Sequence, residues 1–169
     1  MGLGWAYLYN RQYENATAHY LRARELNSND ADLLTEMGNF LIYIGQPKQA
    51  IDQVMEAIRL NPNHYNWYVY YVGWAYEEAG MPKEAIEIFE QAIDLQNPDE
   101  EQLWYLPTVA AAYAHPTVGR MDDARKIVKT ILSRDPEFSI SKKVARYPYK
   151  TKELADRYVN ALRRAGLPD

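Results

Sequence analysis

The sequence predicts an all-α fold, in which helix–turn–helix units stack into an α–α superhelix closed by a C-terminal helical cap. Residues 50–62 and 85–98 align with each other, and each stretch follows a similar glycine-containing turn. Leu154, Tyr158 and Leu162 recur every four residues and predict a final helix. Small residues recur at spacings of 34 to 39 residues, which indicates one repeated two-helix unit. They are Gly4, Gly38, Gly73 and Ala110 on the first helices, and Ala16, Ala50, Ala85 and Ala124 on the second.

The 169 residues divide into four predicted units followed by the cap. The units cover approximately residues 1–30, 31–65, 66–102 and 103–136, and the cap covers residues 137–169. No unit can bury its apolar face alone, so neighbouring units must stack, and about three are the minimum. The first unit is truncated: its first helix is expected to have only about nine residues, which is marginal without packing.

The pattern resembles the tetratricopeptide repeat, a helix–turn–helix unit with small and large residues in fixed slots. The second unit fills these slots with Leu34, Met37, Gly38, Leu41, Ala50, Val54, Ala57 and Pro62. The third fills them with Val69, Val72, Gly73, Tyr76, Ala85, Phe89 and Ala92. The resemblance implies a right-handed solenoid whose first helices line a concave groove. It also implies a protein–protein interaction scaffold.

The C-terminal residues resemble the closing segment of tetratricopeptide regions attached to bacterial class III nucleotidyl cyclases and related regulators. The matching elements are Pro136–Phe138–Ser139, Pro148–Tyr149–Lys150 and the stretch 162–168. This resemblance implies a regulatory or scaffolding module of a bacterial protein and no cyclase activity. Gly166, followed by Pro168, predicts the end of the last helix.

Residues 67–76, WYVYYVGWAY, carry apolar side chains on two faces of one predicted helix. One face holds the packing slots of the repeat, and the opposite face is the one that points into the groove. All four tryptophans of the chain fall in groove slots, and Trp and Tyr dominate binding hot spots. The candidate ligand-binding residues are Trp5, Tyr9, Asn39, Tyr43, Trp67, Tyr70, Tyr71, Trp74 and Trp104. An acidic lip is expected from Glu36, Glu77 and Glu78.

We interpret this aromatic groove as a site for a peptide or protein partner. Self-association is an alternative, in which a homodimer forms through this face or through the residues that would contact a helix preceding the first unit. Tight curvature can instead bury the rings against one another or against the C-terminal cap. A glycan-binding groove is a further alternative, because aromatic rings stack on sugars.

Composition excludes several other functions. The net charge of −4 and the pI near 5.4 argue against nucleic-acid binding. No apolar stretch is long enough for a membrane span. The chain has no cysteine, and its three histidines, His19, His64 and His115, lie far apart in the sequence. We therefore predict no catalytic residue, no metal site and no cofactor. We therefore expect a cytoplasmic, non-enzymatic protein.

Residues 137–169 hold eight Lys or Arg and four Asp or Glu, which indicates a solvated basic cap or contact with an acidic partner.

Overall fold

The computed structural model describes residues 2–95, 98–99 and 102–169, and within them the chain forms ten helices and no strand. The helices are α1 (Leu3–Tyr9), α2 (Tyr13–Leu26), α3 (Ala31–Tyr43), α4 (Pro47–Leu60), α5 (Asn66–Glu78), α6 (Pro82–Ala92), α7 (Leu106–Tyr113), α8 (Met121–Arg134), α9 (Ile140–Val144) and α10 (Lys152–Ala165). The all-α prediction is confirmed.

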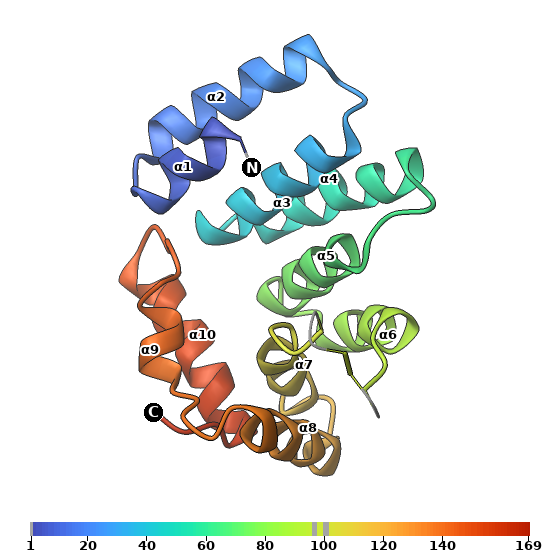
Figure 1. Cartoon of the computed structure of the whole chain (residues 1–169), viewed down its shortest axis with the longest axis vertical. Coiled ribbons are helices and arrows are strands. Elements are labelled where there is room, and N and C mark those ends of the chain that lie inside the picture. The colour runs from blue at the N-terminus through green and yellow to red at the C-terminus, as the bar shows by residue number, and fades with distance from the viewer. Residues whose placement is uncertain (1, 96–97, 100–101) are drawn as a thin grey trace.

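The first eight helices form four consecutive pairs, and one pair lies within each predicted unit. Within the stack, α2 packs on α3, α4 on α5, and α6 on α7. Figure 1 shows the pairs following one another from α1–α2 at one end to α7–α8 at the other. The stack curves, and α9 and α10 lie on its inner side (Figure 1).

Close contact between the two helices of a pair depends on the small residues that set the repeat period. A Cβ atom added at Gly73 of α5 would lie 2.3 Å from the ring of Phe89 on α6. At Gly38 of α3, an added Cβ would lie 2.3 Å from Val54 of α4. Such distances are far below a van der Waals contact, so the large side chain of the second helix fills the space that glycine leaves.

The ends of the helices follow local sequence signals. Pro47 and Pro82 stand in the first turns of α4 and α6, where the missing N–H costs nothing. Gly166 adopts a left-handed φ of 95° directly after α10, as the glycine–proline ending predicts. Trp104 differs from expectation: it was placed on the first helix of the fourth unit but lies in a turn before α7, which begins at Leu106.

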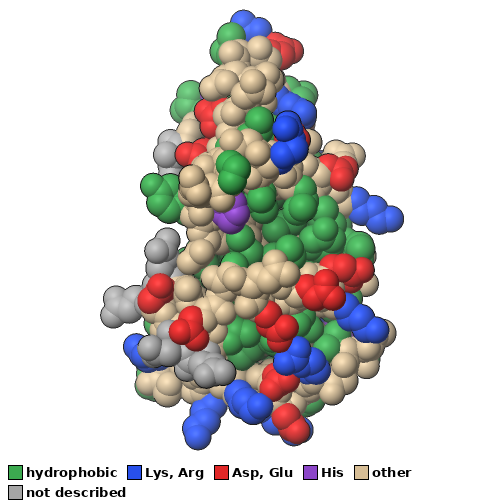
Figure 2. Space-filling view, turned by 90° about the vertical axis from the view of Figure 1, so that its right-hand side faces the viewer, with side chains coloured by type: hydrophobic (Ala, Val, Ile, Leu, Met, Phe, Trp, Pro, Cys, Tyr) green, Lys and Arg blue, Asp and Glu red, His purple; other side chains and the backbone are tan. Residues whose placement is uncertain are grey.

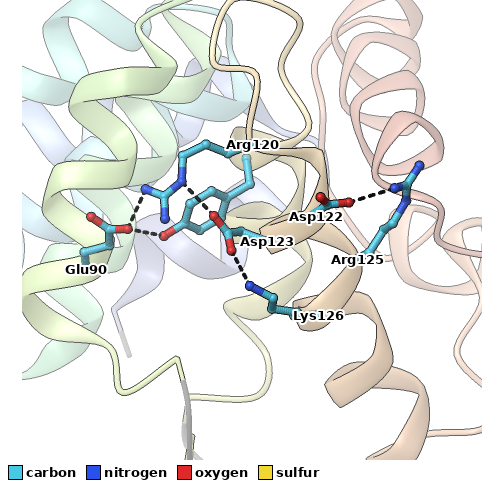
Figure 3. Close-up of polar contacts among 7 residues, drawn as sticks. Glu90, Arg120, Asp122, Asp123, Arg125 and Lys126 are labelled. Atoms are coloured by element: carbon cyan, nitrogen blue, oxygen red, sulfur yellow. Dashed lines mark hydrogen bonds and ion pairs between the residues drawn. The ribbon is translucent and has the colours of Figure 1, made fainter.

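A polar network joins the third helix pair to the fourth (Figure 3). The Arg120 guanidinium, in the turn before α8, donates to Glu90 of α6 at 2.7 Å and to Asp123 of α8 at 2.8 Å. The Tyr113 hydroxyl of α7 donates to the same Glu90 carboxylate at 2.6 Å. These bonds hold the pKa of Glu90 below its usual value, the Tyr113 bond having the largest effect. The network therefore links α6 of the third pair to α7 and α8 of the fourth.

Residues 137–169, here called the C-terminal segment, do more than cover the last pair. Helix α10 packs on α7 and α8, as a terminal cap would. The turn between α9 and α10 reaches the opposite end of the stack, beside α1 and α3 (Figure 1). There the Lys150 N–H donates to the Tyr43 carbonyl at 3.0 Å. The segment thus spans the inner face from the last pair to the first.

Hydrophobic side chains also reach the outer surface. Figure 2 views the side on which α6 and the turn between α4 and α5 lie at the right of Figure 1. Hydrophobic side chains gather in the middle of this side, and acidic and basic side chains surround them (Figure 2). The inner face is therefore not the sole apolar surface of the chain.

Candidate functional site

The inner face is built around an aromatic cluster to which both the repeats and the C-terminal segment contribute. We define the aromatic cluster as Tyr43 of α3, Trp74 of α5, and Tyr147, Tyr149 and Tyr158 of the C-terminal segment. The Tyr43 ring lies 5.3 Å from Trp74 and 5.2 Å from Tyr149, both in edge-on geometry. The Trp74 ring lies 5.6 Å from Tyr158 and 5.8 Å from Tyr147. Aromatic pairs at such distances add about 0.5–1.5 kcal/mol each beyond area burial.

Burial keeps the hydroxyls of this cluster neutral. It raises the pKa of Tyr43, Tyr149 and Tyr158 well above the usual value for tyrosine. The Tyr158 hydroxyl lies 2.8 Å from the Thr108 hydroxyl of α7, so its polar end is satisfied inside the fold. The cluster therefore acts as a packed core between the repeats and the C-terminal segment, and not as a titrating site.

An ion pair between a buried glutamate and a half-exposed arginine ties α5 to α10. The Glu78 side chain is 1% exposed, and its carboxylate accepts hydrogen bonds from the Arg157 guanidinium, with the Nε bond at 2.9 Å. Burial raises the pKa of Glu78, and Arg157 limits that rise. Burial, followed by the neighbouring Glu78, also raises the pKa of Glu77. The acidic lip expected from Glu77 and Glu78 is thus partly used to hold the C-terminal segment.

Arg11 fastens the far end of the C-terminal segment to the first unit. Its guanidinium donates to the backbone carbonyls of Tyr149 at 3.0 Å and Tyr147 at 3.4 Å. Its backbone has a left-handed φ of 58°. The other three units place a glycine with positive φ at the equivalent turn: Gly45, Gly80 and Gly119. Left-handed backbone costs a non-glycine residue roughly 1–2 kcal/mol, so the Arg11 side-chain bonds offset a local strain.

Replacing Arg11 with Gly is expected to loosen the C-terminal segment without unfolding the repeats. The change relieves the left-handed strain and removes the bonds to Tyr149 and Tyr147, so the two effects on global stability oppose each other. Hydrogen–deuterium exchange of the Lys150 amide should become roughly tenfold faster, whereas amides of α6 should keep their rates. Unchanged protection at Lys150 would show that Arg11 does not hold this segment.

The structure separates the predicted ligand-binding residues by accessibility. Four of them are buried: Asn39, Tyr43, Tyr70 and Trp74. Three are half-buried: Trp5, Trp67 and Tyr71. Two are exposed, Tyr9 at 37% and Trp104 at 39%. The alternative in which the rings pack against the cap therefore describes the middle of the face. Tyr43 and Trp74 contact rings of the C-terminal segment, so a ligand role for these two requires the segment to move away. A ligand role for any of the four buried residues stays a prediction.

The aromatic residues that keep some exposure fall into two groups. Near the first unit, the Trp5 and Tyr9 rings stack with centroids 3.9 Å apart. Near the fourth unit, Tyr71 lies 5.9 Å from Trp67 and 6.3 Å from Trp104. Asn39 is buried, and its amide oxygen has no hydrogen-bond partner in the described part of the chain.

An open cavity of about 600 Å³ lies beside Trp104, between the C-terminal end of α8, the short α9 and the turn before α7. We call it the basic cavity. Its apolar lining comes from Leu103, Trp104, Pro107, Ile131, Phe138 and Tyr147. Its charged and polar lining comes from Arg134, Asp135, Glu137, Ser139, Lys142, Lys143 and Arg146. The volume falls in the range of about 300–1,000 Å³ that is typical of ligand sites.

Sequence reasoning missed Arg11 and the basic cavity. Arg11 lies 34 residues before Gly45, at a turn where the other units have glycine. A non-glycine residue at this repeat position could have indicated a special role for Arg11. The cavity forms from two stretches of chain, residues 103–107 and 131–147, and no spacing in the sequence connects them. The excess of basic residues in 137–169 was visible in the sequence, but not the apolar surface that it faces. No cluster of His, Asp and Glu in the described residues has the arrangement of a metal site. None of the described helices is long and apolar enough to span a membrane.

The architecture defines a class of protein, an all-helical solenoid of stacked helix pairs with a concave face. Residues 31–64 and 70–99 match the tetratricopeptide repeat family, so the second and third units carry such repeats. A solved structure described as the crystal structure of MamA has the same fold with a TM-score of 0.65 and 21% sequence identity. The alignment covers 98% of this chain and 93% of that chain. No curated protein matches. The repeats and the fold support a protein-interaction scaffold.

Proposed function

We propose that this chain is a non-enzymatic module that binds a peptide or protein partner through the open part of its aromatic concave face. The observation that carries the proposal is the exposure of Trp104, which lines a cavity and packs edge-on against Tyr70 at 4.3 Å. A tryptophan held by other rings and open on one side loses little entropy when a partner covers it.

The aromatic cluster adds a second argument. The concave face already holds a non-helical stretch of the chain itself, because the turn between α9 and α10 places Tyr147 and Tyr149 against Tyr43 and Trp74. Backbone groups of this turn receive hydrogen bonds from Arg11 and Tyr13. A partner segment that presents aromatic side chains and backbone carbonyls can use the same kinds of contact.

The setting that we propose is a bacterial cytoplasmic protein with a regulatory role. The resemblance of residues 136–168 to tetratricopeptide regions attached to nucleotidyl cyclases supports a module within a signalling protein. The absence of cysteine is compatible with a reducing compartment. Whole-protein function depends on the partner that the concave face selects, since repeat folds carry many roles.

Replacing Trp104 with Ala is expected to weaken binding of selected peptides roughly thirtyfold, because hot-spot aromatic residues contribute about 2 kcal/mol or more. Peptides are first selected on the wild-type protein from a random display library, and their Kd is then measured by fluorescence polarisation. The far-UV circular dichroism should stay that of a helical protein, since Trp104 lies outside the helices and is 39% exposed.

Trp104→Phe is the matched control, because it keeps a ring in the same turn and should retain most of the affinity. A library that yields no binding peptide, or peptides whose affinity ignores both substitutions, would contradict the proposal. If Trp104→Ala loses its helical circular dichroism signal and Trp104→Phe does not, the binding comparison is made between Trp104→Phe and Trp104→Leu. Both variants remove the indole and keep a large apolar side chain in the turn.

Self-association is the second candidate function, and exposed leucines of the first unit favour it. Leu3, Leu21 and Leu26 are 62%, 53% and 72% exposed on α1 and α2. Exposed apolar side chains on one helix pair favour burial against another surface. Light scattering across a protein concentration series distinguishes the two candidates, because a homodimer changes molar mass with concentration and a monomeric scaffold does not.

A further inference from the structure

Four basic residues line the basic cavity without a carboxylate partner among the residues that the structure describes. Arg134, Lys142, Lys143 and Arg146 line it, and none of the four forms an ion pair in the described part of the chain. By contrast, Arg125 near the start of the same α8 pairs with a neighbouring carboxylate at 2.8 Å. Unpaired cations gathered around one cavity attract an anionic partner.

Helix dipoles account for only part of this charge. Arg134 lies in the last turn of α8, and Lys142 and Lys143 lie in the last turn of α9, where a helix C-terminus favours cations. Arg146 lies beyond the end of α9, so a place in the last turn of that helix does not explain its charge. The helix α9 has only five residues, so its dipole is weak. The positive rim therefore exceeds what helix capping requires.

Lys143 is the cation placed deepest in the cavity. Its ammonium group donates to the Trp104 carbonyl at 3.5 Å and lies 5.9 Å from the Phe138 ring and 5.7 Å from the Tyr147 ring. Burial lowers the pKa of Lys143 to about 8, although Asp135 opposes that effect. A partner carboxylate beside this ammonium would favour its charged form and so offset the cost of burial.

The apolar floor adds a second requirement for the ligand. Trp104 and Phe138 present ring surface to the cavity, with Ile131 and Pro107 beside them. A free inorganic anion would leave this floor wet, whereas a side chain of phenylalanine or leucine size would cover it. Asp135 and Glu137 also line the cavity, so a ligand must place its negative charge beside the basic residues and away from these two carboxylates. A peptide with separate acidic side chains can do so, whereas a nucleic-acid backbone carries continuous negative charge.

We propose that the basic cavity binds an acidic peptide segment of a protein partner. One large apolar side chain of that segment enters between Trp104 and Phe138, and flanking carboxylates pair with Lys142, Lys143 and Arg146. This inference rests on the proposed function and specifies its partner class. Charge supplies the selection and the association rate, and the apolar side chain supplies most of the affinity.

The test measures binding of two fluorescein-labelled peptides to the full chain by fluorescence polarisation. The first peptide has one phenylalanine flanked on both sides by glutamates, and the second has glutamine at every glutamate position. We expect the glutamate peptide to bind at least about tenfold more tightly at low salt, with the difference shrinking as salt is added. Equal affinity of the two peptides would overturn the inference.

A charge-matched pair of variants locates the site. The double variant Lys142→Glu and Arg146→Glu should weaken the glutamate peptide about tenfold or more. The control variant Lys48→Glu and Lys83→Glu makes the same change in net charge in the first turns of α4 and α6. Both lysines are exposed, and neither forms an ion pair with the residues that the structure describes. All four positions are exposed, so circular dichroism should match wild type. Equal weakening in both variants would show a general charge effect and overturn the assignment of the cavity.

Two further outcomes separate this inference from the proposed function. Displacement of the peptide by low-millimolar inorganic phosphate would show a simple anion site, which contradicts recognition of a peptide. Neutral peptides that bind through Trp104, while the glutamate peptide does not bind at all, would leave the proposed function standing and reject the acidic partner. Failure of every peptide would reject both.

Discussion

Trp74→Ala is expected to lower the free energy of unfolding by about 3–5 kcal/mol, the usual cost of removing a buried tryptophan. Trp74 is 1% exposed and lies within ring-contact distance of Tyr43, Tyr147 and Tyr158. A substitution to Ala leaves a cavity at the point where the repeats meet the C-terminal segment. Guanidinium chloride unfolding followed by circular dichroism measures the loss.

The control for this prediction is Trp104→Ala, which removes the same side chain from a position that is 39% exposed. Its loss of stability should be less than half that of Trp74→Ala, because much of the Trp104 ring already contacts solvent. A loss below about 1 kcal/mol for Trp74→Ala would mean that the C-terminal segment does not cover Trp74 in solution. The concave face would then be open along its length.

Arg157→Ala is expected to make the protein less stable, and more so as the pH rises. The change leaves the buried Glu78 carboxylate without its guanidinium partner, and removing one partner of such a contact costs roughly 1–3 kcal/mol near neutral pH. Arg157 itself is 52% exposed, so the loss falls below that of a fully buried pair.

The direction of the pH dependence follows from the raised pKa of Glu78. Below the ordinary glutamate pKa, Glu78 holds its proton in both the folded and the unfolded chain, and the variant differs little from wild type. At higher pH the unfolded chain releases a proton that the folded chain retains, so stability falls with rising pH. Without Arg157 the folded pKa is higher still, and the fall is larger.

Thermal unfolding of wild type and Arg157→Ala between acid and mildly alkaline pH tests this expectation. The matched control is Arg163→Ala on the same helix, because Arg163 is equally exposed at 52% but pairs with Asp169, which is 64% exposed. That exposed pair should contribute little at any pH. A gap between wild type and Arg157→Ala that stays constant across the pH range would contradict the role assigned to Glu78.

The helix pairs could be predicted because their packing repeats along the chain. Gly73 must be small for Phe89 to pack against it, and the same relation holds one unit earlier between Gly38 and Val54. A contact that recurs at a fixed spacing leaves a signal in the sequence. Helix ends carry local signals as well, as the proline at the start of α6 and the glycine after α10 illustrate.

The path of the C-terminal segment left no such signal. Its contacts join Tyr149 to Tyr43 and Arg157 to Glu78, and each occurs once, between stretches far apart in the sequence. The sequence predicts the second apolar face of residues 67–76. It does not tell whether these rings bind a partner or pack against tyrosines of the same chain, because the spacing is the same in both cases. Trp104 lies before α7 and not on it. A helix that began at Leu103 would place Pro107 beyond its first turn, where the missing N–H costs a hydrogen bond, whereas α7 holds Pro107 in its first turn.

A linear array of repeats can fold and unfold in pieces, because each unit touches only its neighbours. Here the hydrogen bonds of Arg11 and Tyr13 to Tyr149 join residues 138 and 136 positions apart, which links the two ends of the array. We expect this turn to dock after the intervening pairs have formed, because its partners come together only in the curved stack. Closing so long a loop late in folding should make the chain fold more slowly than an open array of its size. Once the ends are joined, we expect the terminal pairs to fray less and the array to melt with greater cooperativity.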